Sequence, residues 1–183
     1  MNKKTLYLLG LVTLVLFPVP TFVGLYWLED LDPITILEFD RMSFKTIGLG
    51  LLLGVSYAIV ALGLMQAKVF QNMPTRVEQL VRNMRLTIVD CIFLSLCAGV
   101  GEELLFRSGV QFYLGPWITS IFFVAIHGYL NPMNWRMSLY GIIVLPFILL
   151  ISFALPVWGL WFCITAHFSY DLVLFLVMSR EDD

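Results

Sequence analysis

The chain has 183 residues, of which 60% are hydrophobic and only 13% are charged, and its mean hydropathy is +0.88. No ordinary soluble domain is this apolar, so the composition excludes that class and predicts an all-α, polytopic transmembrane helical bundle. The length suits one integral membrane domain, residues 1–183. The formal net charge of −2 gives no reason to expect nucleic acid as a partner, and the partner that composition indicates is the lipid bilayer.

About six apolar stretches follow one another and predict six membrane spans. They cover residues 6–28, 46–65, 86 to about 113, 116–130, 138–155 and 156–178. Pro18 and Pro20 should kink the first span, and Pro156 should open the last. Such a protein would be a multi-pass membrane protein, located in the plasma membrane if the host is a bacterium.

Small residues in the second span suit close packing against another helix. They are Gly48, Gly50, Gly54 and Ala58. After this span, residues 66–85 repeat apolar side chains at helical spacing, with basic residues elsewhere. The pattern predicts an amphipathic helix at the membrane interface, although a solvated linker helix would show the same pattern.

Two adjacent acids, Glu102 and Glu103, lie inside the third span. An ionised side chain at this depth costs at least ~3 kcal/mol, so both carboxylates need partners. Arg107 is one helical turn after Glu103, and this spacing predicts an ion pair that acts as structural support. Glu102 points about a third of a turn away and is then free to be the working carboxylate. A single structural ion network of all three residues is the alternative.

The only two histidines, His127 and His167, both fall within predicted spans. Asp171 is four residues after His167 and can orient its ring on the same helix face. Counted from the expected helix ends, Glu102, His127 and His167 each lie roughly 16 Å from the same side of the membrane. We therefore expect these residues to form one buried catalytic site.

Two chemistries suit this set. A carboxylate and an imidazole can activate water for attack on a carbonyl, while the other histidine and Asp171 bind the oxyanion or orient the base. Alternatively, Glu102, His127 and His167 are ligands of a zinc ion that activates the water. The zinc-protease pattern His-Glu-x-x-His is absent.

These residues carry a resemblance to a known family. The patterns Glu102-Glu103-x-x-x-Arg107, Phe123-x-x-x-His127 and His167-x-x-x-Asp171 resemble the three motifs of the CPBP family, the CAAX prenyl endopeptidases and bacteriocin-processing proteins, also called the abortive-infection family. The resemblance covers about residues 86–178 as a catalytic core. It implies an intramembrane peptidase in which Glu102 and His127 activate water and His167 completes the site with Asp171.

The last motif position departs from part of the family, because eukaryotic members have Asn where this chain has Asp171, whereas many bacterial relatives accept Asp. An acid is a poorer oxyanion donor than an amide unless it is protonated, and it is a better histidine orienter or metal ligand. The resemblance leaves open whether a metal takes part.

The leading hypothesis is an endopeptidase, a CAAX-protease-like hydrolase acting on a peptide or protein substrate that is membrane-bound or prenylated. A second class is a non-catalytic chaperone, scaffold or immunity protein with the same fold. A third is a proton- or metal-coupled transporter that uses the buried acids and histidines as a relay.

Overall fold

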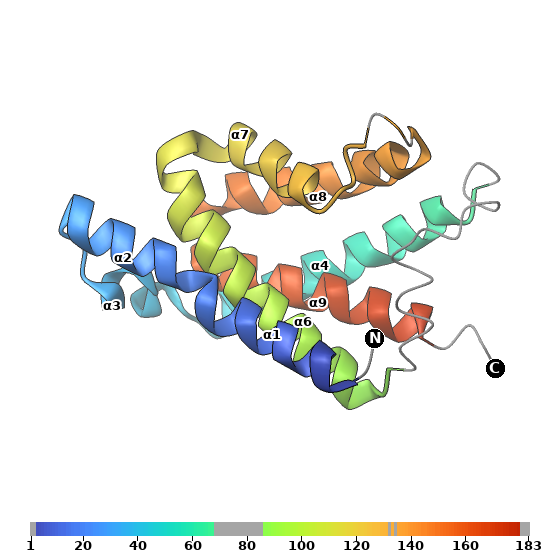
Figure 1. Cartoon of the computed structure of the whole chain (residues 1–183), viewed down its shortest axis with the longest axis horizontal. Coiled ribbons are helices and arrows are strands. Elements are labelled where there is room, and N and C mark those ends of the chain that lie inside the picture. The colour runs from blue at the N-terminus through green and yellow to red at the C-terminus, as the bar shows by residue number, and fades with distance from the viewer. Residues whose placement is uncertain (1–2, 68–85, 132, 134, 180–183) are drawn as a thin grey trace.

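A computed structural model describes residues 3–67, 86–131, 133 and 135–179, and gives only the backbone of residue 136. Within these ranges the chain forms a helical bundle without strands (Figure 1). Its elements are α1 (Lys3–Leu16), α2 (Pro18–Glu29), α3 (Pro33–Ile36), the 3-10 turn η1 (Phe39–Arg41), α4 (Phe44–Met65), α6 (Ile88–Glu103), the π-helix η2 (Leu104–Val110), α7 (Gln111–Ile126), α8 (Trp135–Trp158) and α9 (Leu160–Met178). The predicted amphipathic helix lies outside the described residues from position 68 onward.

The bundle is built around α9, which packs against α4, α6 and α8 (Figure 1). The contact with α4 is the most extensive, because glycines let the two backbones approach. A Cβ atom added to Gly54 would lie 2.1 Å from the carbonyl oxygen of Ala166 on α9, and Gly50 is equally tight against Thr165. Ala58 is fully buried. The prediction of close packing is therefore confirmed for these positions and wrong for Gly48, which faces open space.

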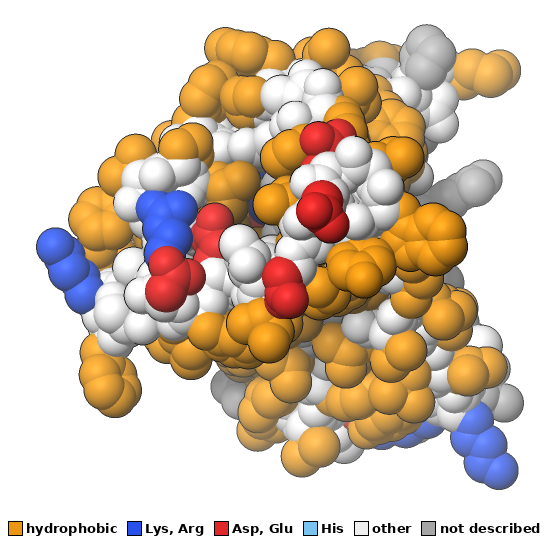
Figure 2. Space-filling model, turned by 90° about the vertical axis from the view of Figure 1, so that its left-hand side faces the viewer, with side chains coloured by type: hydrophobic (Ala, Val, Ile, Leu, Met, Phe, Trp, Pro, Cys, Tyr) orange, Lys and Arg blue, Asp and Glu red, His pale blue; other side chains and the backbone are white. Residues whose placement is uncertain are grey.

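The outside of the bundle is apolar, as expected for a surface in contact with lipid. Large side chains such as Leu52, Ile142 and Val157 are more than 60% exposed. Four helical segments are long and apolar enough to cross a membrane. They are Lys3–Glu29, Phe44–Met65, Met137–Trp158 and Leu160–Met178. Acidic side chains gather on the end of the molecule seen in Figure 2, amid an apolar surface. These observations agree with an all-α membrane bundle.

The third and fourth predicted spans correspond to α6 and α7, which are shorter than the four helical segments just named. α6 and α7 have 16 residues each, although α6 continues without interruption through η2 to Leu114. Gly115 then breaks the helix with a φ of 71°, a conformation that favours glycine. The first predicted span is divided at Phe17, as its prolines indicated. The count of six spans stays a prediction.

Pro156 does not open the last helix, contrary to the sequence prediction. α8 continues to Trp158 and ends at Gly159, whose φ is 81°. A proline inside a helix leaves the carbonyl four residues earlier without its donor. Here that carbonyl belongs to Ser152, and it accepts a hydrogen bond from Gln111 Nε2 at 2.8 Å. A side chain from α7 thus replaces the missing backbone donor, and α8 can pass through the proline.

α7 ends earlier than predicted, at Ile126, so that His127 is its C-terminal cap rather than a helical residue. The backbone N–H of Gly128 donates to Ala125, and that of Tyr129 donates to Val124. These two bonds, with a φ of 76° at Gly128, form a Schellman motif. The turn fixes the direction in which His127 and Tyr129 leave the helix.

α6 and η2 are held in place by the N-terminal helices. Asp90, near the start of α6, is buried and forms an ion pair with Lys3 of α1 at 2.6 Å. Further along, the Thr21 hydroxyl of α2 donates to the carbonyl oxygen of Leu104 at 3.0 Å. A π-helix leaves irregular carbonyl groups, and this hydroxyl satisfies one of them. Both contacts fix the segment that carries Glu102 and Glu103.

Substitution of Gly54 by alanine tests the packing of α4 against α9. We expect Gly54→Ala to lower stability by about 1–3 kcal/mol, because the new methyl group overlaps the Ala166 backbone. Gly48→Ala is the matched control and should leave stability equal or slightly higher, since its site is open and alanine favours helix. Thermal unfolding in detergent would measure both, and equal midpoints would contradict the packing argument.

Candidate active site

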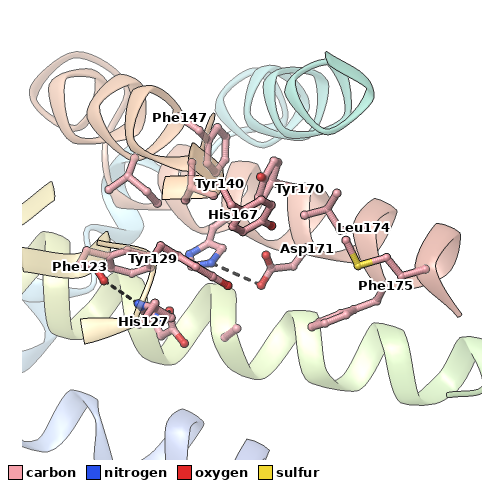
Figure 3. Close-up of a pocket in the computed structure, with 15 residues that line it drawn as sticks. Phe123, His127, Tyr129, Tyr140, Phe147, His167, Tyr170, Asp171, Leu174 and Phe175 are labelled. Atoms are coloured by element: carbon pink, nitrogen blue, oxygen red, sulfur yellow. Dashed lines mark hydrogen bonds and ion pairs between the residues drawn. The ribbon is translucent and has the colours of Figure 1, made fainter. Parts of the chain in front are cut away.

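A cavity of about 220 Å³ lies between α6 and α9 on one side and the α7–α8 hairpin on the other (Figure 3). Its wall includes the four side chains predicted to form one site: Glu102, His127, His167 and Asp171. Three tyrosines also line it: Tyr129, Tyr140 and Tyr170. The fold therefore brings the predicted residues together from three helical segments that are distant in sequence: Glu102 from α6, His127 from the end of α7, and His167 and Asp171 from the middle of α9.

Glu103 is fully buried behind this cavity, and its two carboxylate oxygens contact Arg107 and His167. One carboxylate oxygen accepts a hydrogen bond from Arg107 Nε at 2.9 Å, and the pair is fully buried. The other oxygen lies 2.8 Å from His167 Nδ1. The guanidinium carbon of Arg107 is also 5.6 Å from the centre of the Phe123 ring. The predicted pair of Glu103 with Arg107 is present, and the additional link to His167 was not expected from the sequence.

His167 has a carboxylate at each ring nitrogen. Besides the Glu103 contact, its Nε2 atom is 3.4 Å from Asp171 Oδ2 (Figure 3). A doubly protonated imidazole would donate to both carboxylates, and its charge together with that of Arg107 would balance Glu103 and Asp171. Because unpaired charges are costly in a buried site, this neutral quartet is the favourable arrangement.

Glu102 faces the other histidine. Its Oε2 atom is 3.5 Å from His127 Nε2, and the two side chains are 14% and 30% exposed. His127 Nδ1 lies 2.7 Å from the carbonyl oxygen of Phe123, so this nitrogen carries a proton and donates to it (Figure 3). In the neutral ring, Nε2 is then an acceptor that faces a second acceptor. A single water molecule can donate to both groups.

Small residues on α6 allow this convergence. A Cβ atom on Gly99 would lie 3.0 Å from the backbone of Ile164 on α9, and one on Gly101 would lie 2.1 Å from the Thr13 carbonyl oxygen on α1. The absence of a side chain at both positions permits this close approach. The three tyrosines were missed, although Tyr129 is two residues after His127 and Tyr170 directly precedes Asp171.

The zinc prediction can be compared with the free donor atoms. Both nitrogens of His167 already face carboxylates, and Nδ1 of His127 donates to a carbonyl. In the part of the chain that the structure describes, no group of three or more His, Cys, Asp or Glu side chains is arranged to hold a metal ion. The set Glu102, His127 and His167 therefore does not fit three-ligand zinc coordination in this arrangement.

Comparison with known proteins gives a match to a protein family. The family model described as type II CAAX prenyl endopeptidase Rce1-like matches residues 84–173. No curated protein and no solved structure matches the chain. The matched segment contains all three sequence motifs and the four predicted site residues that line the cavity. This match over residues 84–173 confirms the predicted resemblance to the CPBP family, the CAAX prenyl endopeptidase-like membrane proteins.

Proposed function

We propose that the protein is a multi-pass intramembrane endopeptidase that hydrolyses a peptide bond with a water molecule activated by Glu102 and His127. The family match supports peptide hydrolysis in a membrane setting. The observation that carries the mechanism is the approach of Glu102 Oε2 to His127 Nε2 at 3.5 Å within the cavity. Both atoms can accept a proton, and both residues line the same cavity.

In this mechanism a water molecule donates one hydrogen to each of these acceptors. Glu102 takes a proton as the water oxygen bonds to the peptide carbonyl carbon, and the carbonyl electron pair moves onto its oxygen. When the oxyanion collapses, the bond from carbon to nitrogen breaks, and the protonated Glu102 gives its proton to the leaving amine. The carboxylate is thereby regenerated, and one water is consumed for each bond cleaved.

His167 supports this step electrostatically. As an imidazolium held between Glu103 and Asp171, it places a positive charge beside the reacting carbonyl. Asp171 acts by orienting the ring through its ion pair with His167 Nε2 at 3.4 Å, since an ionised carboxylate has no proton to donate. Glu103 and Arg107 fix the other side of the ring and do not touch the substrate.

The cavity also indicates the kind of substrate. Beyond Asp171, the apolar side chains of Leu174 and Phe175 on α9 lead away from the polar groups (Figure 3), and Met178 also lines the cavity. An apolar wall of this kind suits a peptide with hydrophobic side chains or a lipid-modified end. We propose a membrane-bound or prenylated peptide as the substrate, and the plasma membrane as the location in a bacterial host.

Replacement of Glu102 tests the assignment directly. Glu102→Gln keeps the size of the side chain but cannot take a proton, so peptide cleavage by the purified protein should fall at least 10²-fold. Asp40→Asn is the matched control, because Asp40 is an exposed carboxylate in η1, outside the cavity. A Glu102→Gln protein that cleaves peptide at the wild-type rate would refute the proposal. Normal function of this variant in the host would instead favour a scaffold or immunity protein.

A second pair of variants separates support from catalysis. Arg107→Met leaves the buried Glu103 without its main cation and should lower stability by about 3–5 kcal/mol. Glu102→Gln should leave the unfolding midpoint nearly unchanged, and Lys4→Met serves as the control for loss of an exposed cation. Unfolding in detergent measures all three. A normal midpoint for Arg107→Met would show that the ion pair does not support the fold.

Zinc remains a prediction that metal analysis can decide. With water activated by Glu102 and His127 alone, we expect the purified protein to hold less than one zinc per chain and to keep its activity after dialysis against a chelator. One zinc per chain, lost together with activity on chelation and restored with added zinc, would establish the metal mechanism and refute the one proposed here.

A further inference from the structure

Hydrolysis of a peptide bond needs a hydrogen-bond donor for the oxygen on which negative charge develops. Removing one such donor from a hydrolase lowers the rate by about 10²–10³-fold. The mechanism proposed above assigns no residue to this role. The cavity contains many polar groups, but most of them are acceptors or are already engaged. Few groups of the cavity wall can therefore donate a hydrogen bond to the oxyanion.

The four ionisable residues supply no unengaged donor. Glu102 and Asp171 are acceptors when ionised. His127 donates from Nδ1 to the Phe123 carbonyl, and its Nε2 faces Glu102. His167 faces carboxylates with both nitrogens.

Backbone amides next to the site are engaged as well. The N–H groups of His127, Gly128 and Tyr129 donate to carbonyls of α7 in the Schellman motif. The parts of α6, α8 and α9 that line the cavity are helical, so their amides are used within the helices. An oxyanion site made from backbone amides, as in many hydrolases, is thus absent from the described cavity wall.

Three phenolic hydroxyls remain among the side chains of the described wall: Tyr129, Tyr140 and Tyr170. Phenols keep their proton near neutral pH and are good donors. The ring of Tyr170 stacks on Phe147 at 4.4 Å and lies 6.0 Å from Tyr57 of α4, which places it on the side away from α6. Tyr140 contacts the edge of Tyr129 from α8.

Of the three tyrosines, Tyr129 is the one whose ring contacts that of His127. Its ring lies parallel to that of His127, with centres 6.0 Å apart and an angle of 14° between the planes. In Figure 3 its hydroxyl points toward the space between His127 and Asp171. The turn at Gly128 holds both rings, so the base and a donor leave the end of α7 side by side.

We infer that Tyr129 is a further catalytic residue, whose hydroxyl donates a hydrogen bond to the oxyanion formed during peptide hydrolysis. The inference rests on the proposed function. It gives the proposed hydrolysis a hydrogen-bond donor to the oxyanion that does not depend on Asp171. No proton leaves Tyr129 in this role, because the hydroxyl only stabilises the charge until the carbon–nitrogen bond breaks. The residue therefore acts on the transition state more than on the bound substrate.

The test is Tyr129→Phe, which removes one oxygen atom and keeps the aromatic stacking. We expect kcat to fall by about 10²–10³-fold with KM changed less than about threefold. Affinity for a peptide phosphinate, a tetrahedral analogue of the intermediate, should fall in parallel with kcat. Tyr26→Phe is the matched control, since Tyr26 is an exposed tyrosine on α2, outside the cavity.

The outcomes separate the two proposals. If the wild type cleaves, Glu102→Gln does not and Tyr129→Phe matches the wild type, the role of Tyr129 is refuted while the endopeptidase stands. The same holds if kcat falls in Tyr170→Phe or Tyr140→Phe but not in Tyr129→Phe. A rise in KM together with a lower unfolding midpoint would make Tyr129 a structural residue only. A wild type that cleaves no peptide overturns both proposals.

Discussion

The charge on Glu103 is the constraint around which the helices are arranged. This carboxylate has no exposed surface, so it is compatible with a folded bundle only while Arg107 and His167 remain beside it. Arg107 comes from the same helical segment, but His167 comes from α9, the helix at the centre of the bundle. The second contact therefore joins α6 to α9 at one defined height. Gly99 allows the two backbones to come close enough for that contact.

Much of this site could be predicted because its chemistry is rare in a membrane. Charged side chains at depth need partners, and the chain has only two histidines to offer. The spacing of four residues placed Arg107 beside Glu103, and Asp171 beside His167. Helix lengths alone indicated that Glu102, His127 and His167 reach a similar depth. The structure brings these side chains to one cavity wall, although their catalytic roles remain predictions.

Other features depend on local geometry that residue spacing does not encode. A π-helix after Glu103 changes the angular position of the residues that follow, and no residue type marks such a segment reliably. The early end of α7 depends on the left-handed conformation of Gly128, which is one glycine among 13 in the chain. Pro156 was taken as a helix start because its missing donor is visible in the sequence, whereas its replacement by Gln111 is not. The cavity tyrosines were missed because aromatic residues are common in any apolar helix.

The position of His127 in a turn has a mechanical consequence. Half of the site, on α6 and α9, is cross-linked by buried ionic contacts, and moving it would separate charges in a medium of low polarity. The other half, on α7 and α8, is attached by aromatic contacts, by hydrogen bonds such as that from the Tyr57 hydroxyl to the Ile143 carbonyl oxygen at 2.8 Å, and by the 3.5 Å approach of His127 to Glu102, none of which is a fully buried ion pair. A peptide that enters the cavity, as the proposed function requires, has to pass between these two halves. The contacts of the α7–α8 half cost less to separate than the buried ion pairs, so substrate entry on this proposal would leave the ionic half unchanged.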